Sequence, residues 1–155
     1  MPLLAGPFCS TAKGQSGCAQ VFMANENRKT EVSTIRMEQK TEIFLALKDL
    51  LQKYEGEFAI KANTPSHYYL ETRSMSLNGR RLFFAAAKLK KNYVSFYLTP
   101  LNMYPELSVR VSPGLRKTMQ GQSCFNLTMP SRDDLNELRN LTEAGYQRFR
   151  KEPLL

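Results

Sequence analysis

The sequence contains a single histidine and only three cysteines, and these shortages weaken several classes of functional site. A zinc site or a Cys–His nucleophile needs several such side chains brought together. Cys9, Cys18 and Cys124 are odd in number and show no C-x-x-C spacing, so no disulfide framework is predicted. The P-loop, G-x-S-x-G and H-E-x-x-H motifs are also missing, which favours binding over catalysis.

Long apolar runs are absent as well, so the sequence predicts no membrane-spanning helix and no membrane partner. No basic stretch precedes the short apolar Leu3–Ala5, which argues against a secretory signal, and we expect a cytoplasmic location. What is present is a chain of 155 residues with 42% apolar content, enough for one core. Residues 1–36 show no sustained periodicity and are predicted to be a disordered extension or sequence upstream of the native start, with one domain over 37–155.

The periodicity of the domain predicts a helix at each end and strands between them. Apolar residues recur at helical spacing over 41–54, and a second amphipathic helix is predicted after the Ser131 cap. The turn signal Asn78-Gly79 and the short connections predict antiparallel hairpins. A short helical turn is predicted after Ser112-Pro113, and the predicted strands are residues 57–63, 67–74, 81–89, 93–99 and 123–128. We therefore expect an α+β fold, a two-layer α-β sandwich in which both terminal helices cover one face of an antiparallel meander sheet.

Alternation along each strand predicts which side chains point away from the helices. In the second strand these are His67, Tyr69, Glu71 and Arg73; in the third, Lys88 sets the phase and places Leu82, Phe84 and Ala86 outward. Aromatic residues on an open sheet face are typical of a surface that binds flat ligands or a partner chain, although cross-strand aromatic pairs can also simply stabilise a sheet. The predicted ligand-binding or partner-binding residues are Tyr69, Phe84, Tyr93, Tyr97, Cys124 and Asn126.

The positive charge of the chain is concentrated in its middle third. The formal net charge is +8, and the segment from Arg73 to Lys117 contains a single acid, Glu106. Such a segment beside aromatic side chains makes nucleic-acid binding an alternative, although no RNP-like or helix-turn-helix motif accompanies it.

Two short motifs carry a resemblance to a known family: residues 92–100, NYVSFYLTP, and residues 119–126, MQGQSCFN. Over about Glu38 to Lys151 the chain resembles the YdhG-like family of small bacterial domains of unknown function. The resemblance implies a frataxin-like α-β sandwich and, as some members are iron chaperones, a metal role for the acidic residues of the first helix and adjoining strand, namely Glu38, Glu42, Asp49, Glu55 and Glu57. Iron is the one cofactor that it suggests, and no cofactor is otherwise required.

The iron-chaperone alternative faces a geometric condition. Glu42 and Asp49 are two helical turns apart, about 10 Å along the axis, so they cannot share one ion without further ligands. A catalytic carboxylate pair assembled by folding, such as Glu57 with Glu71, also stays open. The first hypothesis is a non-enzymatic binding module that uses the open sheet face for a small ligand or a protein partner. The iron chaperone and nucleic-acid binding are its alternatives.

Overall fold

The computed structural model describes residues 33–34 and 36–152. They belong to two compact units, Met1–Gln39 and Lys40–Leu155. In the first unit the described residues, 33–34 and 36–39, are helical. Most of the extension predicted for residues 1–36, with Cys9 and Cys18, lies outside the described residues.

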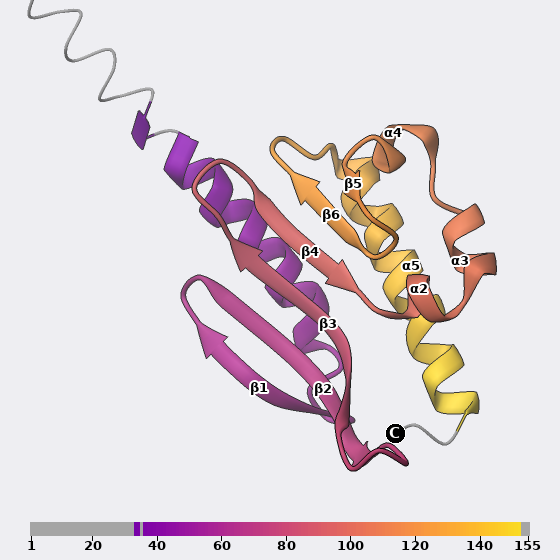
Figure 1. Cartoon of the computed structure of the whole chain (residues 1–155). Helices are drawn as coiled ribbons and strands as arrows, with labels where there is room; N and C mark the ends of the chain where they lie inside the picture. The colour runs from indigo at the N-terminus through magenta and orange to yellow at the C-terminus, as the bar shows by residue number, and fades with distance from the viewer. Residues whose placement is uncertain (1–32, 35, 153–155) are drawn as a thin grey trace, which may run out of the picture. The chain divides into compact units, whose positions relative to one another are not determined.

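The second unit is built on a six-stranded antiparallel sheet with the order β1-β2-β3-β4-β6-β5 (Figure 1). Helical residues 40–52, called here the N-terminal helix, precede the sheet, and α5 follows it. The strands are β1 (Phe58–Thr64), β2 (His67–Met75), β3 (Arg81–Leu89), β4 (Val94–Leu98), β5 (Met119–Gln120) and β6 (Cys124–Leu127), and the other helices are α2 (Pro100–Met103), α3 (Pro105–Val109), α4 (Pro113–Arg116) and α5 (Arg132–Lys151). The α+β prediction and the meander of the first four strands are confirmed.

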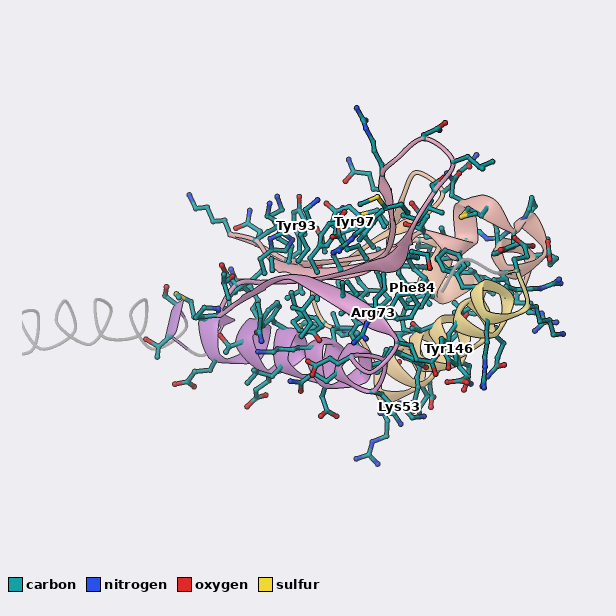
Figure 2. The ribbon with its side chains drawn as sticks, turned by 90° about the horizontal axis from the view of Figure 1, so that it is seen from below. Lys53, Arg73, Phe84, Tyr93, Tyr97 and Tyr146 are labelled. Carbon is teal, nitrogen blue, oxygen red and sulfur yellow. The ribbon has the colours of Figure 1, made fainter. Side chains whose placement is uncertain are left out.

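The N-terminal helix and α5 lie on the same face of the sheet, so this unit has two layers (Figure 2). We call the face toward these helices the inner face and the opposite one the outer face. The core fills the space between sheet and helices: Phe58, Phe84 and Phe149 are at most 1% exposed, and Phe58 stacks on Phe84 with ring centroids 4.1 Å apart. Burial of such large side chains is the main favourable contribution to folding.

Local signals in the sequence explain where several elements begin. The Ser131 hydroxyl accepts a hydrogen bond from the Asp134 N–H, and the Asp134 carboxylate accepts one from the Ser131 N–H, which starts α5 as a capping box. Gly79 adopts a φ of 69° in the turn between β2 and β3, as the Asn-Gly signal predicts. The Ser112 hydroxyl caps α4.

Candidate functional site

The side chains of β2 and β4 divide between the two faces as alternation predicts. In β2, Tyr68 and Leu70 are fully buried, while Tyr69 between them is half-buried. In β4, Val94 and Phe96 belong to the core, and Tyr93 and Tyr97 point away from the helices (Figure 2). The outer positions predicted for Tyr69, Tyr93 and Tyr97 are therefore confirmed.

The predicted outer position of Phe84 is wrong, because a β-bulge interrupts alternation in β3. Leu70 pairs with Ala85, whereas the next residue, Glu71, pairs with Phe83, so Phe84 is an extra residue without a partner in β2. Lys88 and Ala86 point outward, as alternation predicts. From Phe84 back to the start of β3, the bulge reverses which residues face outward. Phe84 is 0% exposed in the core.

Phe83 replaces Phe84 as the outer aromatic residue of β3. Its ring stacks on Tyr69, with centroids 4.5 Å apart and planes 24° from parallel, and lies 6.5 Å from the ring of Tyr97. Ala86 pairs with Tyr69 on one side and Tyr97 on the other, and it is only 2% exposed although its side chain faces outward. These four residues, Tyr69, Phe83, Ala86 and Tyr97, form the ring cluster at the centre of the outer face.

Polar side chains continue the outer face across β4 and β6. The Ser95 hydroxyl donates to the side-chain oxygen Oδ1 of Asn126 at 3.0 Å. The side-chain Nδ2 of Asn126 donates to Oε1 of Gln120 at 2.8 Å. Cys124 and Asn126 thus lie on the outer face, as predicted. Burial raises the pKa of the Cys124 thiol, with smaller opposing effects from Tyr97 and Lys90, so the thiol is not activated as a nucleophile.

Cations surround the ring cluster, and Glu71 is the only carboxylate among the outward positions of the six described strands. Lys61 and Arg81 both pair with Glu71, at 3.5 and 3.3 Å, and the Lys61 ammonium lies 5.2 Å from the Tyr69 ring centroid. Lys88 pairs with Ser95 in the outer row and carries no ion pair among the described residues. The face therefore has an excess of positive charge.

Two further side chains of β2, His67 and Arg73, make contacts within the fold. His67 contacts Tyr69 edge-on with centroids 5.9 Å apart. Burial, and then the charges of Lys88 and Lys90, lower the pKa of His67, which keeps its ring neutral at neutral pH. Arg73, for which alternation predicts an outward position, instead reaches back to the main-chain oxygen of Glu55 at 3.4 Å.

The acidic residues proposed as iron ligands are not gathered into one site. Within the described part of the chain, no three His, Cys, Asp or Glu side chains lie in position to hold a metal ion. Glu42 and Asp49 are exposed on the N-terminal helix, Glu38 is exposed in the first unit, and Glu57 accepts a hydrogen bond from Tyr146 of α5. Glu71 lies on the outer face, so the pair Glu57–Glu71 is not formed either.

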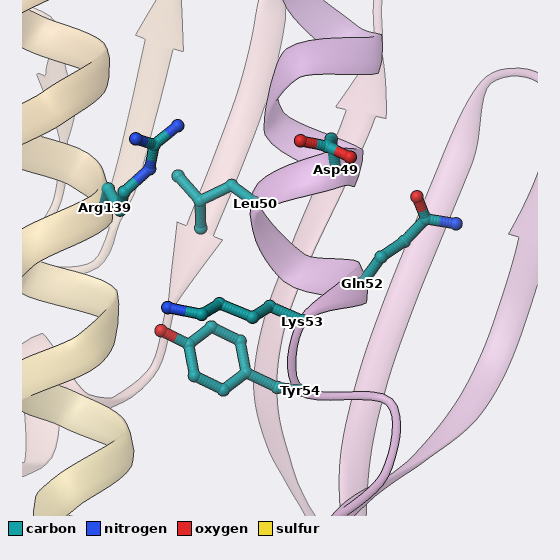
Figure 3. A pocket seen from close by; sticks show the side chains of 6 residues that line it. All are labelled: Asp49, Leu50, Gln52, Lys53, Tyr54 and Arg139. Atoms are coloured by element: carbon teal, nitrogen blue, oxygen red, sulfur yellow. The ribbon is translucent and has the colours of Figure 1, made fainter.

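The helix side of the sheet has an open groove between the end of the N-terminal helix and α5 (Figure 3). Its volume is about 460 Å³, and Lys53 and Arg139 reach into it from the two sides. A neighbouring hollow of about 260 Å³ shares Lys53 and Tyr54 with it. The Tyr54 hydroxyl in this region donates to Glu143 at 2.6 Å, so this phenol is paired within the fold. This groove is the main competitor of the outer face as a binding site.

Comparison with known proteins gives no relative: no protein-family model, no curated protein and no solved structure matches this chain significantly. The resemblance to the YdhG-like family and the iron role that it implies stay predictions. Within the described residues, no helix is long and apolar enough to cross a membrane.

Proposed function

We propose that this chain is a non-enzymatic binding module that holds a ligand or a protein partner on the outer face of its sheet. The observation that carries the proposal is the ring cluster. Three aromatic side chains from the neighbouring strands β2, β3 and β4 contact one another on the face that none of the described helices covers (Figure 2).

The packing of the cluster gives it the properties of a binding surface. Tyr69, Phe83 and Tyr97 are half-buried, so each ring is held by its neighbours while part of it stays in contact with water. Rigid aromatic residues lose little conformational entropy on binding and provide large contact areas, which is why they are enriched at interfaces. Beside them the half-buried Asn126 amide and the exposed Gln120 side chain, which accepts from it, supply polar groups at the rim of the cluster.

Several observations favour binding over catalysis at this face. The Cys124 thiol has a raised pKa, and His67 is neutral and packs against Tyr69 instead of approaching a nucleophile. Glu71 is paired with Lys61 and Arg81. The face thus offers contact area and charge, and its described residues include no pair of groups arranged for proton transfer.

A fragment screen followed by amide NMR of the full chain tests this proposal. Small planar molecules bind preferentially where a protein has a binding hot spot. We expect the amide shifts caused by the hits to cluster around Tyr97, Ala86 and Phe83. Tyr97→Ala and Phe83→Ala should each weaken the hits about tenfold while the amide spectrum stays that of a folded protein.

The groove that contains Lys53 and Arg139 supplies the comparison site. Lys53→Ala removes a groove side chain on the inner-face side and should leave binding at the outer face unchanged. If the hits instead cluster in the groove and are weakened by Lys53→Ala, the proposed function is wrong.

A further inference from the structure

The hydrogen-bond partners of the tyrosines differ between the two faces of the sheet. Four tyrosine hydroxyls on the inner-face side each donate to a glutamate, at distances of 2.5 to 2.8 Å: Tyr54 to Glu143, Tyr68 to Glu55, Tyr104 to Glu152 and Tyr146 to Glu57. The other three tyrosines, Tyr69, Tyr93 and Tyr97, lie on the outer face, and within the described residues none of them bonds to a carboxylate. Every tyrosine on the inner-face side therefore donates its hydroxyl to a glutamate carboxylate.

The outer face combines unpaired phenols with unpaired positive charge. Tyr97 contacts Ser95 and Cys124, but the hydroxyls of Tyr69 and Tyr93 have no hydrogen-bond partner among the described residues. Lys88 has no ion pair there, and Lys90 acts electrostatically on both His67 and Cys124, which places its charge near the same face. Glu71, the one outward carboxylate of the described strands, is already shared by two cations.

We infer that the occupant of the outer face is an acidic segment of a partner protein, whose Asp or Glu side chains accept hydrogen bonds from Tyr69 and Tyr93 and lie beside Lys88. This inference rests on the proposed function of the face. Hydrogen bonds from a neutral donor to an ionised acceptor are stronger than neutral pairs. Complementary charge further fixes the orientation of a partner and speeds its association.

Charge also argues against a second copy of the chain as the occupant. Two outer faces meeting in a symmetric dimer would bring Lys88 and Lys90 of one copy against the positively charged face of the other. Like charges brought together at an interface cost several kcal/mol. The net charge of +8 adds to this repulsion.

The geometry of the rings separates an acidic protein segment from a single-stranded nucleic acid. Bases bind such surfaces by stacking on free aromatic faces. Phe83 stacks on Tyr69 from the β3 side, and Lys61 lies over the Tyr69 ring from the β1 side, so both faces of this ring are occupied. At Tyr69 the ring edge and the phenol oxygen are what remain for a partner, and a carboxylate is suited to these.

Selection from a phage-displayed library of random peptides on the full chain tests the inference. The selected peptides are synthesised, located on the protein by amide NMR, and compared with versions in which Glu and Asp are replaced by Gln and Asn. We expect acidic peptides whose shifts map to the outer face, with affinity reduced at least about tenfold by the amide replacements.

Matched variants identify the groups on the protein that recognise the peptide. Tyr69→Phe and Tyr93→Phe remove only a hydroxyl from the outer face and should each weaken binding about tenfold. Tyr104→Phe makes the same change on the inner-face side and should have no effect on binding. Lys88→Glu should weaken binding by more than tenfold, whereas Arg132→Glu, the same charge reversal at the exposed start of α5, should not.

The possible outcomes separate the inference from the function on which it rests. Peptides that map to the outer face but are neutral or basic, or that tolerate the Tyr→Phe changes, overturn the acidic partner and leave the binding face intact. Peptides that map elsewhere on the chain overturn both. A single-stranded thymidine oligonucleotide that binds the outer face more tightly than the selected peptides overturns the inference in favour of nucleic acid.

Discussion

The pair of variants Phe84→Ala and Phe83→Ala tests the β-bulge that decides which aromatic residue of β3 belongs to the outer face. Phe84 is 0% exposed. It stacks on Phe58 and contacts Tyr54 and Phe149 edge-on at 6.1 and 5.3 Å. Removal of a buried phenylalanine side chain costs about 3–5 kcal/mol. We expect Phe84→Ala to reach the upper part of this range, because aromatic pairs add about 0.5–1.5 kcal/mol each beyond burial.

Phe83→Ala removes the same atoms from the outer face, where the ring is half-buried and water can replace it. Its main loss is the stack on Tyr69, so we expect a destabilisation of about 1–2 kcal/mol. Urea unfolding followed by far-UV circular dichroism measures both values, since tryptophan fluorescence is not available in a chain without tryptophan. Equal losses for the two variants, or a larger loss for Phe83→Ala, would refute the bulge and with it the assignment of the outer face.

Three further measurements test the packing of this unit. Thr72→Val should destabilise it by about 1–3 kcal/mol in urea unfolding. The Thr72 hydroxyl accepts a hydrogen bond from the Leu82 N–H at 2.9 Å, and a valine would leave this buried donor unpaired. An unchanged free energy of unfolding would contradict that hydrogen bond. Gly145→Ala should lower the melting temperature, with a cost of about 1–3 kcal/mol, because the added carbon would lie 2.6 Å from the Pro100 ring; an unchanged melting temperature would show that α5 and Pro100 are further apart. Burial and the Glu143 contact raise the pKa of Tyr54, so the folded chain keeps the phenol proton at a pH where the unfolded chain loses it. The free energy of unfolding should therefore fall as the pH rises above about 10. Tyr54→Phe should make this fall shallower, and an equally steep fall in the variant would contradict the raised pKa.

The strands and their sides follow from the sequence where alternation is uninterrupted. In β2 more exposed and buried residues alternate from His67 to Arg73, in β4 the half-buried Tyr97 lies between two buried residues, and the sequence alone places Tyr69 and Tyr97 correctly. In β3, two phenylalanines occur in succession, and nothing in the sequence shows which of them is the extra residue of a bulge. The phase taken from Lys88 therefore holds at Ala86 and fails at the next aromatic residue.

Helix ends are predictable to the extent that their caps are local. The Ser131 capping box and the Ser112 cap are recognisable because donor and acceptor are a few residues apart. The helices α2 and α3, of four and five residues, are too short to show a hydrophobic period, and β5 has only two residues. These elements were not predicted, because packing and not periodicity defines them.

The features that support the acidic partner are long-range and escape sequence analysis. Tyr54 and Glu143 are 89 residues apart, as are Tyr146 and Glu57. Only the folded chain shows that the inner-face tyrosines have carboxylate partners and that the outer ones have none among the described residues. Lys61 reaches Tyr69 beside a bulge in β1, where the pairing shifts between Ile60 and Ala62. The sequence shows the positive charge of the middle third and the outward Glu71, but not which cations pair with Glu71 or that Phe83 takes the place of Phe84.

Fluorine NMR of the full chain labelled with 3-fluorotyrosine tests the binding face most directly, because all seven tyrosines report at once. Three of them, Tyr69, Tyr93 and Tyr97, lie on the outer face, and the four that donate to glutamates serve as internal controls. On addition of a selected acidic peptide, we expect the three outer signals to shift and the other four to stay unchanged. Shifts confined to the four inner-face tyrosines would contradict this expectation.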